Sequence, residues 1–135
     1  MSYNETRFRV RYAETDQMGI VYHANYLIWM ELGRVEYCRA RGLRYRDIEE
    51  QDGIRMAVVE AKCRFVSPAR YDDEIIVRTE IERAHQRMVR FAYRILHAEE
   101  NRLLAEGTTT HLFLDRNMRP SRLPEKYLSC FGIAR

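Results

Sequence analysis

The segment from Asp16 to His23 brings together a carboxylate, an imidazole and the expected start of a helix. Asp16 lies in a polar stretch, and His23 comes about where a long apolar segment begins. The first N–H groups of a helix lack partners within the helix and carry a partial positive charge. They can polarise a substrate carbonyl as an oxyanion hole does, while a nearby carboxylate acts as nucleophile or general base. In a purely structural interpretation, Asp16 caps the turn and His23 makes a hydrogen bond at the helix start.

The chain that follows has the length and residue types of a helix from about Ala24 to Arg41. Between Ala24 and Leu32 only Asn25 and Glu31 are strongly polar, so apolar side chains cover every side of the helix. A helix that is apolar all round is buried within its protein. We therefore expect a buried central helix. We also expect Glu31 to make a buried ion pair or hydrogen bond, because an unpaired carboxylate there would be costly.

Five further segments alternate between apolar and polar residues, a pattern typical of half-buried strands. Their apolar positions fall within residues 8–12, 59–65, 75–81, 89–95 and 105–113. The first of these predicts Phe8, Val10 and Tyr12 on one face. The short intervals between the later segments suit antiparallel hairpins. The order of strand, long helix and four strands predicts an α+β fold, in which a five-stranded antiparallel sheet wraps around one buried helix.

Composition limits the class of protein. A chain of 135 residues has the size of one domain, which we place at residues 1–135. With 46% hydrophobic and 32% charged residues, it is neither a disordered chain nor a membrane span. The first residues lack a basic-then-apolar signal region. Cys38, Cys63 and Cys130 form no disulfide framework, so we expect a cytoplasmic protein.

The net charge of +3 comes almost wholly from arginine, since Lys62 and Lys126 are the only lysines. Arginine suits phosphate groups, but acidic residues are interspersed along the chain. The charge pattern therefore hints at an anionic ligand, and no recognised nucleic-acid-binding motif accompanies it. Asp16, His23 and His111 have no metal-ligand spacing, so we expect no metal site. His111 falls among the apolar strand positions, which favours a core histidine.

The run from Tyr12 to Leu27, with Trp29, Glu31 and Arg34 after it, resembles the signature of hotdog-fold acyl-CoA thioesterases. It is similar to the 4-hydroxybenzoyl-CoA thioesterase family, in particular to the branch that includes the bacterial Tol–Pal-cluster thioesterase. Residues 65–73 resemble the family's second-strand exit, so the resemblance extends over almost the whole chain. It implies the hotdog fold and hydrolysis of an acyl-CoA thioester to a carboxylate and free CoA. It also implies that no cofactor is needed, because CoA is part of the substrate.

The resemblance also implies roles for single residues in the first motif. Asp16 corresponds to the catalytic aspartate, and Gly19 is expected to contact the substrate. The backbone N–H groups of Tyr22 and His23 would polarise the thioester carbonyl. The His23 side chain would handle water or the leaving thiolate, or position Asp16. Gln17, which follows the aspartate, and His23 depart from the 4-hydroxybenzoyl-CoA enzymes, which argues against 4-hydroxybenzoyl-CoA as the natural substrate.

A second group of positions would bind the CoA half of the substrate. His85, Gln86 and Arg87 match the family's phosphate contacts, and only Arg87 keeps a firm positive charge. Three neighbouring residues match the strand start that runs along the acyl and pantetheine arm, namely Met56, Ala57 and Val58.

Two other functions remain open at this stage. The chain could be a non-catalytic hotdog module that binds acyl-CoA or acyl carrier protein, although such a binder has no need for a carboxylate beside the thioester. It could also be a hotdog dehydratase, but that chemistry needs a helix-borne acid, and Asp16 precedes the helix. A single helix on a five-stranded sheet leaves an edge strand bare, which predicts at least a homodimer and favours a homotetramer.

Overall fold

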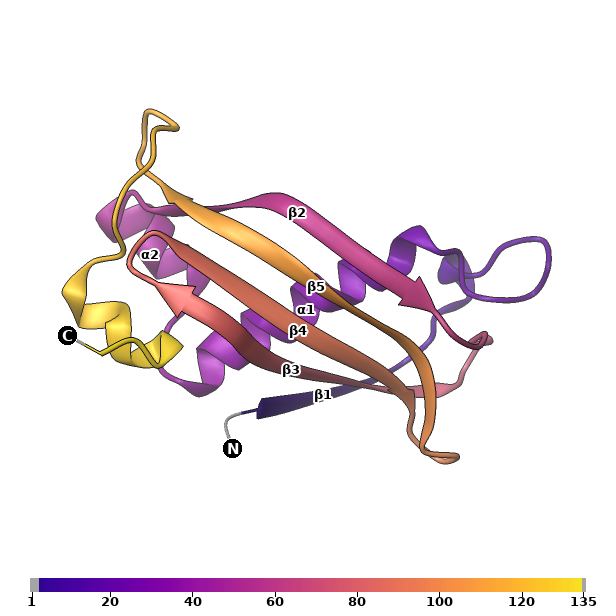
Figure 1. Ribbon diagram of the computed structural model, residues 1–135. Helices are drawn as coiled ribbons and strands as arrows, with labels where there is room; N and C mark the ends of the chain where they lie inside the picture. Colours follow the sequence, from indigo (N-terminus) through magenta and orange to yellow (C-terminus); the bar gives the residue numbers. More distant parts are fainter. Residues whose placement is uncertain (1–2, 135) are drawn as a thin grey trace.

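The protein forms one antiparallel sheet with a long helix across one of its faces (Figure 1). This computed structural model describes residues 3–134, so residues 1–2 and 135 of the expected domain lie outside the described residues. The sheet order is β1-β3-β4-β5-β2, with antiparallel pairing throughout. The strands are β1 (Tyr3–Arg9), β2 (Arg55–Phe65), β3 (Glu74–His85), β4 (Met88–His97) and β5 (Arg102–Leu114). The predicted α+β architecture is confirmed, and it is the arrangement of the hotdog fold.

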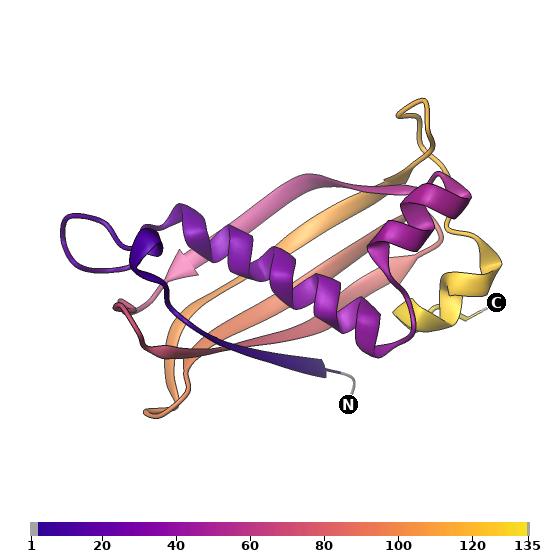
Figure 2. The same ribbon diagram turned by 180° about the vertical axis from the view of Figure 1, so that it is seen from behind.

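The long helix α1 (Ala24–Ala40) lies diagonally across the sheet, as Figure 2 shows from behind. At Gly33 the helix backbone approaches the sheet closely. A Cβ atom at this position would come within 2.5 Å of Thr79 Oγ1 and 2.7 Å of Val77 Cγ1 on β3. Trp29 and Met30 are 2% and 0% exposed, so this side of the helix forms the centre of the core.

The prediction that the helix is buried on every side is wrong for the single chain. Leu27, Ile28 and Leu32 are 42%, 54% and 39% exposed, because the sheet covers only one side of α1. Glu31 is exposed as well, and it makes no ion pair or hydrogen bond within residues 3–134, contrary to the expected buried pair. The helix therefore leaves an apolar surface uncovered.

The alternation in the three central strands is confirmed. Their inward-facing side chains are fully or almost fully buried, among them Ile75, Val77, Thr79, Val89, Phe91, Tyr93, Ile95, Thr109 and Phe113. The two edge strands differ from the prediction. β1 ends at Arg9, and Tyr12 lies in the short 3₁₀ turn η1 (Tyr12–Glu14), where it is 78% exposed. On β2, Val59 is 54% exposed, since the strand is bare along one edge and a bulge at this residue shifts its alternation.

Two shorter elements close one end of the sheet. The polar stretch after α1 forms α2 (Tyr45–Asp52), and the tail ends in the 3₁₀ helix η2 (Glu125–Phe131). Tyr127 of η2 donates a hydrogen bond to the Asp52 carboxylate, and Lys126 Nζ lies 2.9 Å from the same group. The segment with Asp16 lies at the opposite end of the molecule (Figure 1).

His111 is a core histidine, as predicted. It is completely buried on β5, where its Nε2 lies 2.8 Å from Thr109 Oγ1, and that hydroxyl in turn lies 2.6 Å from the Tyr93 hydroxyl. Burial, together with the positive charge of Arg34, lowers the pKa of His111 from 6.5 to about 4. The imidazole is therefore neutral in the folded protein at pH 7.

We expect His111 to make the fold sensitive to acid. Between pH 6.5 and 4 the unfolded chain binds a proton at this residue and the folded chain does not, so stability falls as pH falls through that window. The loss reaches about 3 kcal/mol, and it does not grow further below the folded pKa. Urea unfolding of the wild type and of His111→Gln at a series of pH values measures the difference. Identical pH slopes for the two proteins would contradict the prediction.

Candidate active site

A cavity of about 360 Å³ lies beside the start of α1 and contains both Asp16 and His23. We call it the Asp16 cleft. One side comes from the segment before the helix, and the other comes from the end of β2 and the chain that follows it. The cleft is lined by Asp16, Met18, Ile20, Val21, His23, Tyr26 and Phe65–Pro68. Most of these side chains are apolar, so a carboxylate and an imidazole share a largely hydrophobic surface.

Asp16 is held by its own backbone in a tight loop. Its N–H donates to the carbonyl of Ile20 (2.9 Å), and its carbonyl accepts from Gly19 N–H (2.9 Å). The carboxylate accepts one hydrogen bond, from Met18 N–H (2.8 Å). Within residues 3–134 it has no cationic partner, so one carboxylate oxygen is left for other contacts.

Gly19 serves the loop rather than the cleft. Its φ of +80° is a left-handed conformation that glycine adopts at little cost. Gly19 is not among the residues that line the cleft, so the expected substrate contact has no support from the geometry. The glycine closes the turn on which Asp16 sits.

The helix start offers two unpaired amides, of which one, His23 N–H, is among the two that the sequence predicted. Tyr22 N–H donates to the carbonyl of Glu14 (2.9 Å), so it is not free to bind a substrate carbonyl, which corrects the prediction for Tyr22. The N–H groups of His23 and Ala24 have no hydrogen-bond acceptor among the described residues. The free donors at this helix start are therefore one residue further along the chain than expected.

The His23 side chain lies on the surface of the cleft and makes no capping hydrogen bond. Its ring centroid is 4.4 Å from that of Tyr22 and 6.1 Å from that of Phe65, the latter in an edge-on arrangement. The structural interpretation of His23 as a hydrogen-bonded residue at the helix start is therefore wrong. The imidazole is exposed and rests between two aromatic rings.

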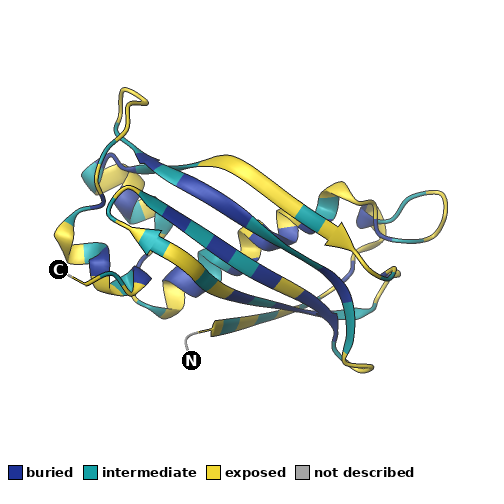
Figure 3. Cartoon of the chain, in the orientation of Figure 1, coloured by how far each residue is buried: buried dark blue, intermediate teal, exposed yellow. Residues whose placement is uncertain are grey.

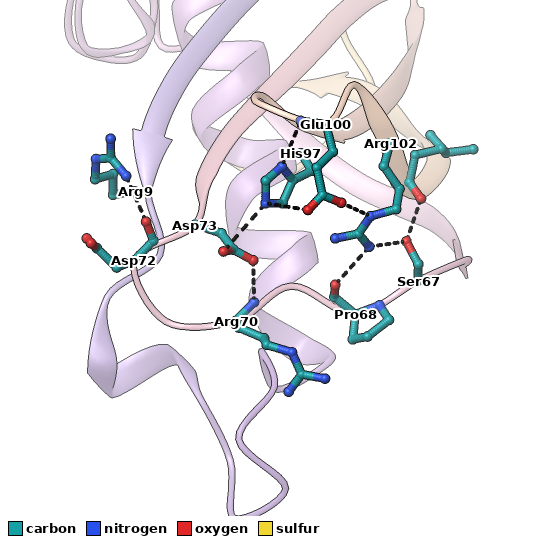
Figure 4. Close-up of polar contacts among 10 residues, drawn as sticks. Arg9, Ser67, Pro68, Arg70, Asp72, Asp73, His97, Glu100 and Arg102 are labelled. Carbon is teal, nitrogen blue, oxygen red and sulfur yellow. Dashed lines mark hydrogen bonds and ion pairs between the residues drawn. The ribbon is translucent and has the colours of Figure 1, made fainter.

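The wall opposite Asp16 is fixed by a polar network (Figure 4). Arg102 donates to Ser67 Oγ (2.8 Å) and to the carbonyl of Pro68 (3.3 Å), and Ser67 Oγ donates to the carbonyl of Leu103 (2.8 Å). Further along, the Asp73 carboxylate accepts from Arg70 N–H (2.8 Å). These bonds fix residues 65–73, the segment whose sequence resembles the second-strand exit of the thioesterase family.

The same network ties the wall to the sheet and to the Asp16 loop. His97 at the end of β4 is buried, and its Nε2 lies 3.5 Å from the Asp73 carboxylate. The carbonyl of Ala69 accepts a hydrogen bond from Val21 N–H (2.9 Å). The loop and the wall are thus joined directly by a backbone hydrogen bond.

The residues expected to bind CoA lie at the other end of the molecule. Arg87 is exposed in the β3–β4 hairpin, and Met56, Ala57 and Val58 begin β2 near α2. The Asp16 cleft borders the far end of β2, at Phe65. A single chain therefore does not bring the two groups of predicted site residues together (Figure 1).

A larger cavity, of about 480 Å³, lies between β1 and α1. It contains the carboxylates of Glu14 and Glu31 and apolar side chains that include Phe8 and Leu32. The carboxylate of Glu14 is already occupied by three hydrogen bonds, and none of the unpaired helix-start amides borders this cavity. We therefore place the candidate active site in the smaller Asp16 cleft.

Two parts of the site were not found by reasoning from the sequence. The Ala24 amide takes the place of the Tyr22 amide because the loop folds back and pairs Tyr22 N–H with Glu14, and no residue type signals that path. The cleft wall at Phe65–Pro68 follows a strand end, and its only signal was the resemblance of residues 65–73. Among residues 3–134, no group of three or more His, Cys, Asp or Glu side chains is placed to hold a metal ion. None of the described helices combines the length and hydropathy that crossing a membrane requires.

Comparisons with known proteins identify the family and the fold. Residues 10–131 match the thioesterase-like superfamily. The putative acyl-CoA thioesterase YneP of Bacillus subtilis is 37% identical over 86% of this chain and 83% of its own length. The acyl-CoA thioester hydrolase YbgC of Escherichia coli O157:H7 is 32% identical over 91% of each chain. The crystal structure of a DHNA-CoA thioesterase from Staphylococcus aureus superimposes with a TM-score of 0.88 and 32% identity, over 96% of this chain and 85% of that one.

Proposed function

The chain belongs to the thioesterase-like superfamily, and we propose that it is an acyl-CoA thioesterase that works through the Asp16 cleft. One observation carries the proposal. The Asp16 carboxylate, which has no cationic partner among the described residues, and His23, whose amide has no acceptor there, line one apolar cleft, and the unpaired Ala24 amide follows His23 in the chain. Relatives named as acyl-CoA thioesterases are similar over most of the chain, which supports the same reaction class.

In the proposed mechanism, the thioester carbonyl accepts hydrogen bonds from the N–H groups of His23 and Ala24. These amides stabilise the negative charge that develops on the carbonyl oxygen, and the helix dipole adds to the effect. Asp16 attacks the carbonyl carbon itself, or it takes a proton from the water that attacks. In both routes the C–S bond breaks and CoA leaves as a thiolate, which then takes up a proton. In the nucleophilic route Asp16 is left joined to the acyl group as a mixed anhydride, which water then hydrolyses to the carboxylic acid and free Asp16. In the general-base route the attacking water gives the acid directly, and neither route needs a cofactor.

We further propose that the active site is completed by a second copy of the chain, paired along β2. This strand has one bare edge, and most of its residues are exposed (Figure 3). Proteins rarely leave such an edge uncovered. Its exposed apolar side chains, Val58, Val59 and Phe65, would be covered by the same contact.

Antiparallel pairing along β2 also explains why the predicted site residues lie far apart in one chain. The strand runs from Arg55 to Phe65, and a two-fold pairing about its middle brings the first residues of one copy beside the last residues of the other. Met56 of one chain would then approach the Asp16 cleft of its partner, on the side bordered by Phe65. A dimer is the smallest assembly that does this, and two such dimers would form the expected tetramer.

Arg87 is proposed to contact a phosphate of CoA, far from the reacting carbonyl. It is exposed and makes no ion pair within residues 3–134. We expect Arg87→Ala to raise KM for an acyl-CoA by about tenfold, the scale of one charge-assisted hydrogen bond, with kcat little changed. A truncated pantetheine thioester, which lacks the phosphates, serves as the control substrate. Equal changes for the two substrates would show that Arg87 contacts no phosphate.

An assay with a panel of thioesters identifies the preferred acyl group and shows whether CoA or acyl carrier protein carries it. The neighbour from Staphylococcus aureus is named as a DHNA-CoA thioesterase, whereas YneP and YbgC are named for acyl-CoA in general. The panel therefore contains short, long and aromatic acyl-CoAs and one acyl carrier protein thioester, with free thiol as the readout. Thiol release from at least one acyl-CoA supports the proposal, and release from none refutes it.

The cysteines are unpaired, which fits the proposed cytoplasmic location.

A further inference from the structure

Glu14 is a buried carboxylate directly before the Asp16 loop, and no part of the proposed reaction uses it. It is 5% exposed. One oxygen accepts from the backbone N–H of Arg11 (2.8 Å). The other accepts from Trp29 Nε1 (2.8 Å) and from Arg11 Nη2 (3.3 Å). Glu14 does not line the Asp16 cleft, so the carboxylate does not touch a substrate bound there.

The backbone of the same residue holds the base of the loop. The carbonyl of Glu14 accepts two hydrogen bonds of 2.9 Å, one from Tyr22 N–H and one from Asn25 Nδ2. Tyr22 lies where the loop ends, and Asn25 belongs to the first turn of α1. The beginning of the loop, its end and the helix start therefore all meet at Glu14.

Trp29, which donates to the Glu14 carboxylate, is packed in the core. Its side chain is 2% exposed, and its ring lies edge-on to Phe8 (5.2 Å) and Tyr26 (4.9 Å). Because the indole is held by its neighbours, its N–H fixes the position of the Glu14 carboxylate relative to α1. The loop cannot shift along the helix without breaking this bond.

We propose that Glu14 is a positioning residue, which joins the Asp16 loop to Trp29 and so sets the place of the Asp16 carboxylate relative to the free amides of His23 and Ala24. The inference rests on the proposed thioesterase function. In that reaction the amides must contact the carbonyl oxygen while Asp16 acts at the carbonyl carbon. A misplacement of about 1 Å can lower the rate by up to 10²-fold.

The negative charge of Glu14 suits this role. Burial by itself would raise the pKa of Glu14, but the hydrogen bonds from Arg11 and Trp29 and the charge of Arg11 outweigh it and lower the pKa. An ionised carboxylate only accepts hydrogen bonds, as its three donors require. A glutamine of the same size would turn an NH₂ group towards one of these donors, so Glu14→Gln must lose at least one bond.

The test compares Glu14→Gln with Glu36→Gln, which removes a partly exposed carboxylate of α1 whose one charged partner among residues 3–134 is Arg39. Thiol release is measured well below the midpoint of thermal unfolding and expressed per folded molecule. We expect Glu14→Gln to lower kcat by about 10- to 100-fold with KM within about threefold, whereas Glu36→Gln stays close to the wild type. Trp29→Phe, which removes the indole N–H, should lower kcat in the same way, and it replaces Glu14→Gln if that variant does not fold.

A double variant separates positioning from a general structural role. If Glu14 acts through Asp16, adding Glu14→Gln to Asp16→Asn produces no further loss of kcat. An additional loss as large as in the single variant would overturn the inference, as would a folded Glu14→Gln with the kcat of the wild type. Failure of the proposed function would look different, because the wild type itself would then release no thiol.

Discussion

Asp16→Asn is expected to lower kcat for thioester hydrolysis by about 10²-fold or more, the scale of losing a general base or nucleophile. The amide keeps the size of the side chain, and its oxygen can still accept the bond from Met18 N–H. However, the amide is a very poor base and nucleophile. Binding of a non-hydrolysable acyl-CoA should change little, because the cleft keeps its shape. Steady-state kinetics and a binding titration on the same preparation measure both quantities.

His23→Ala is the companion variant. The proposed role of His23 falls on its backbone N–H, which persists without the imidazole, so we expect a smaller loss of kcat than for Asp16→Asn. A larger loss would mean that the two roles are assigned wrongly. If Asp16 only caps its loop, Asp16→Asn would instead lower the unfolding temperature while kcat per folded molecule survives.

Val59→Lys should separate the protein into monomers and abolish most of its activity. Val59 is 54% exposed on the bare edge of β2, and lysine on an edge strand blocks pairing with a second strand. The monomer would lack the partner's contribution to the Asp16 cleft, so we expect kcat/KM to fall by about 10²-fold. Analytical ultracentrifugation and activity measured over a range of protein concentrations provide the test.

Ile28→Lys is the matched control. Ile28 is also 54% exposed, but it lies on α1 beside the cavity that adjoins β1. This variant should remain at least dimeric and active. A wild-type protein that sediments as a monomer and still turns over substrate would contradict the shared active site, as would a monomeric Val59→Lys with full activity.

Much of the fold could be predicted because its signals are local. The alternation around Phe91 and Tyr93 requires only that one face of the strand meets the core, and the structure buries that face. The helix after His23 was predicted to within one residue of its end, since its length and residue types are unambiguous. Asp16 was singled out by its position in the loop before that helix together with the family resemblance, and its catalytic role stays a prediction.

Other features depend on contacts that no local pattern encodes. The Tyr22 amide is taken by the carbonyl of Glu14 because the loop folds back on its own start. The role of Glu14 depends on Trp29, which lies beyond the loop and over a full turn into the helix. Val59 belongs to a segment in which apolar and polar residues alternate, as in a strand with one buried face. Its strand, however, lies at the edge of the sheet, and Val59 is exposed. Hydropathy cannot distinguish a side chain that faces the core from one that faces a partner.

The measurement that tests the central claim most directly is a single-turnover assay with the wild-type protein in excess over an acyl-CoA. Free thiol and carboxylic acid are followed together with the amount of acyl-CoA bound. We predict one thiol and one acid for each acyl-CoA bound, at a rate about 10²-fold or more above that of Asp16→Asn. Saturable binding of acyl-CoA without release of thiol would contradict the account, because the chain would then be a binding module and not a thioesterase.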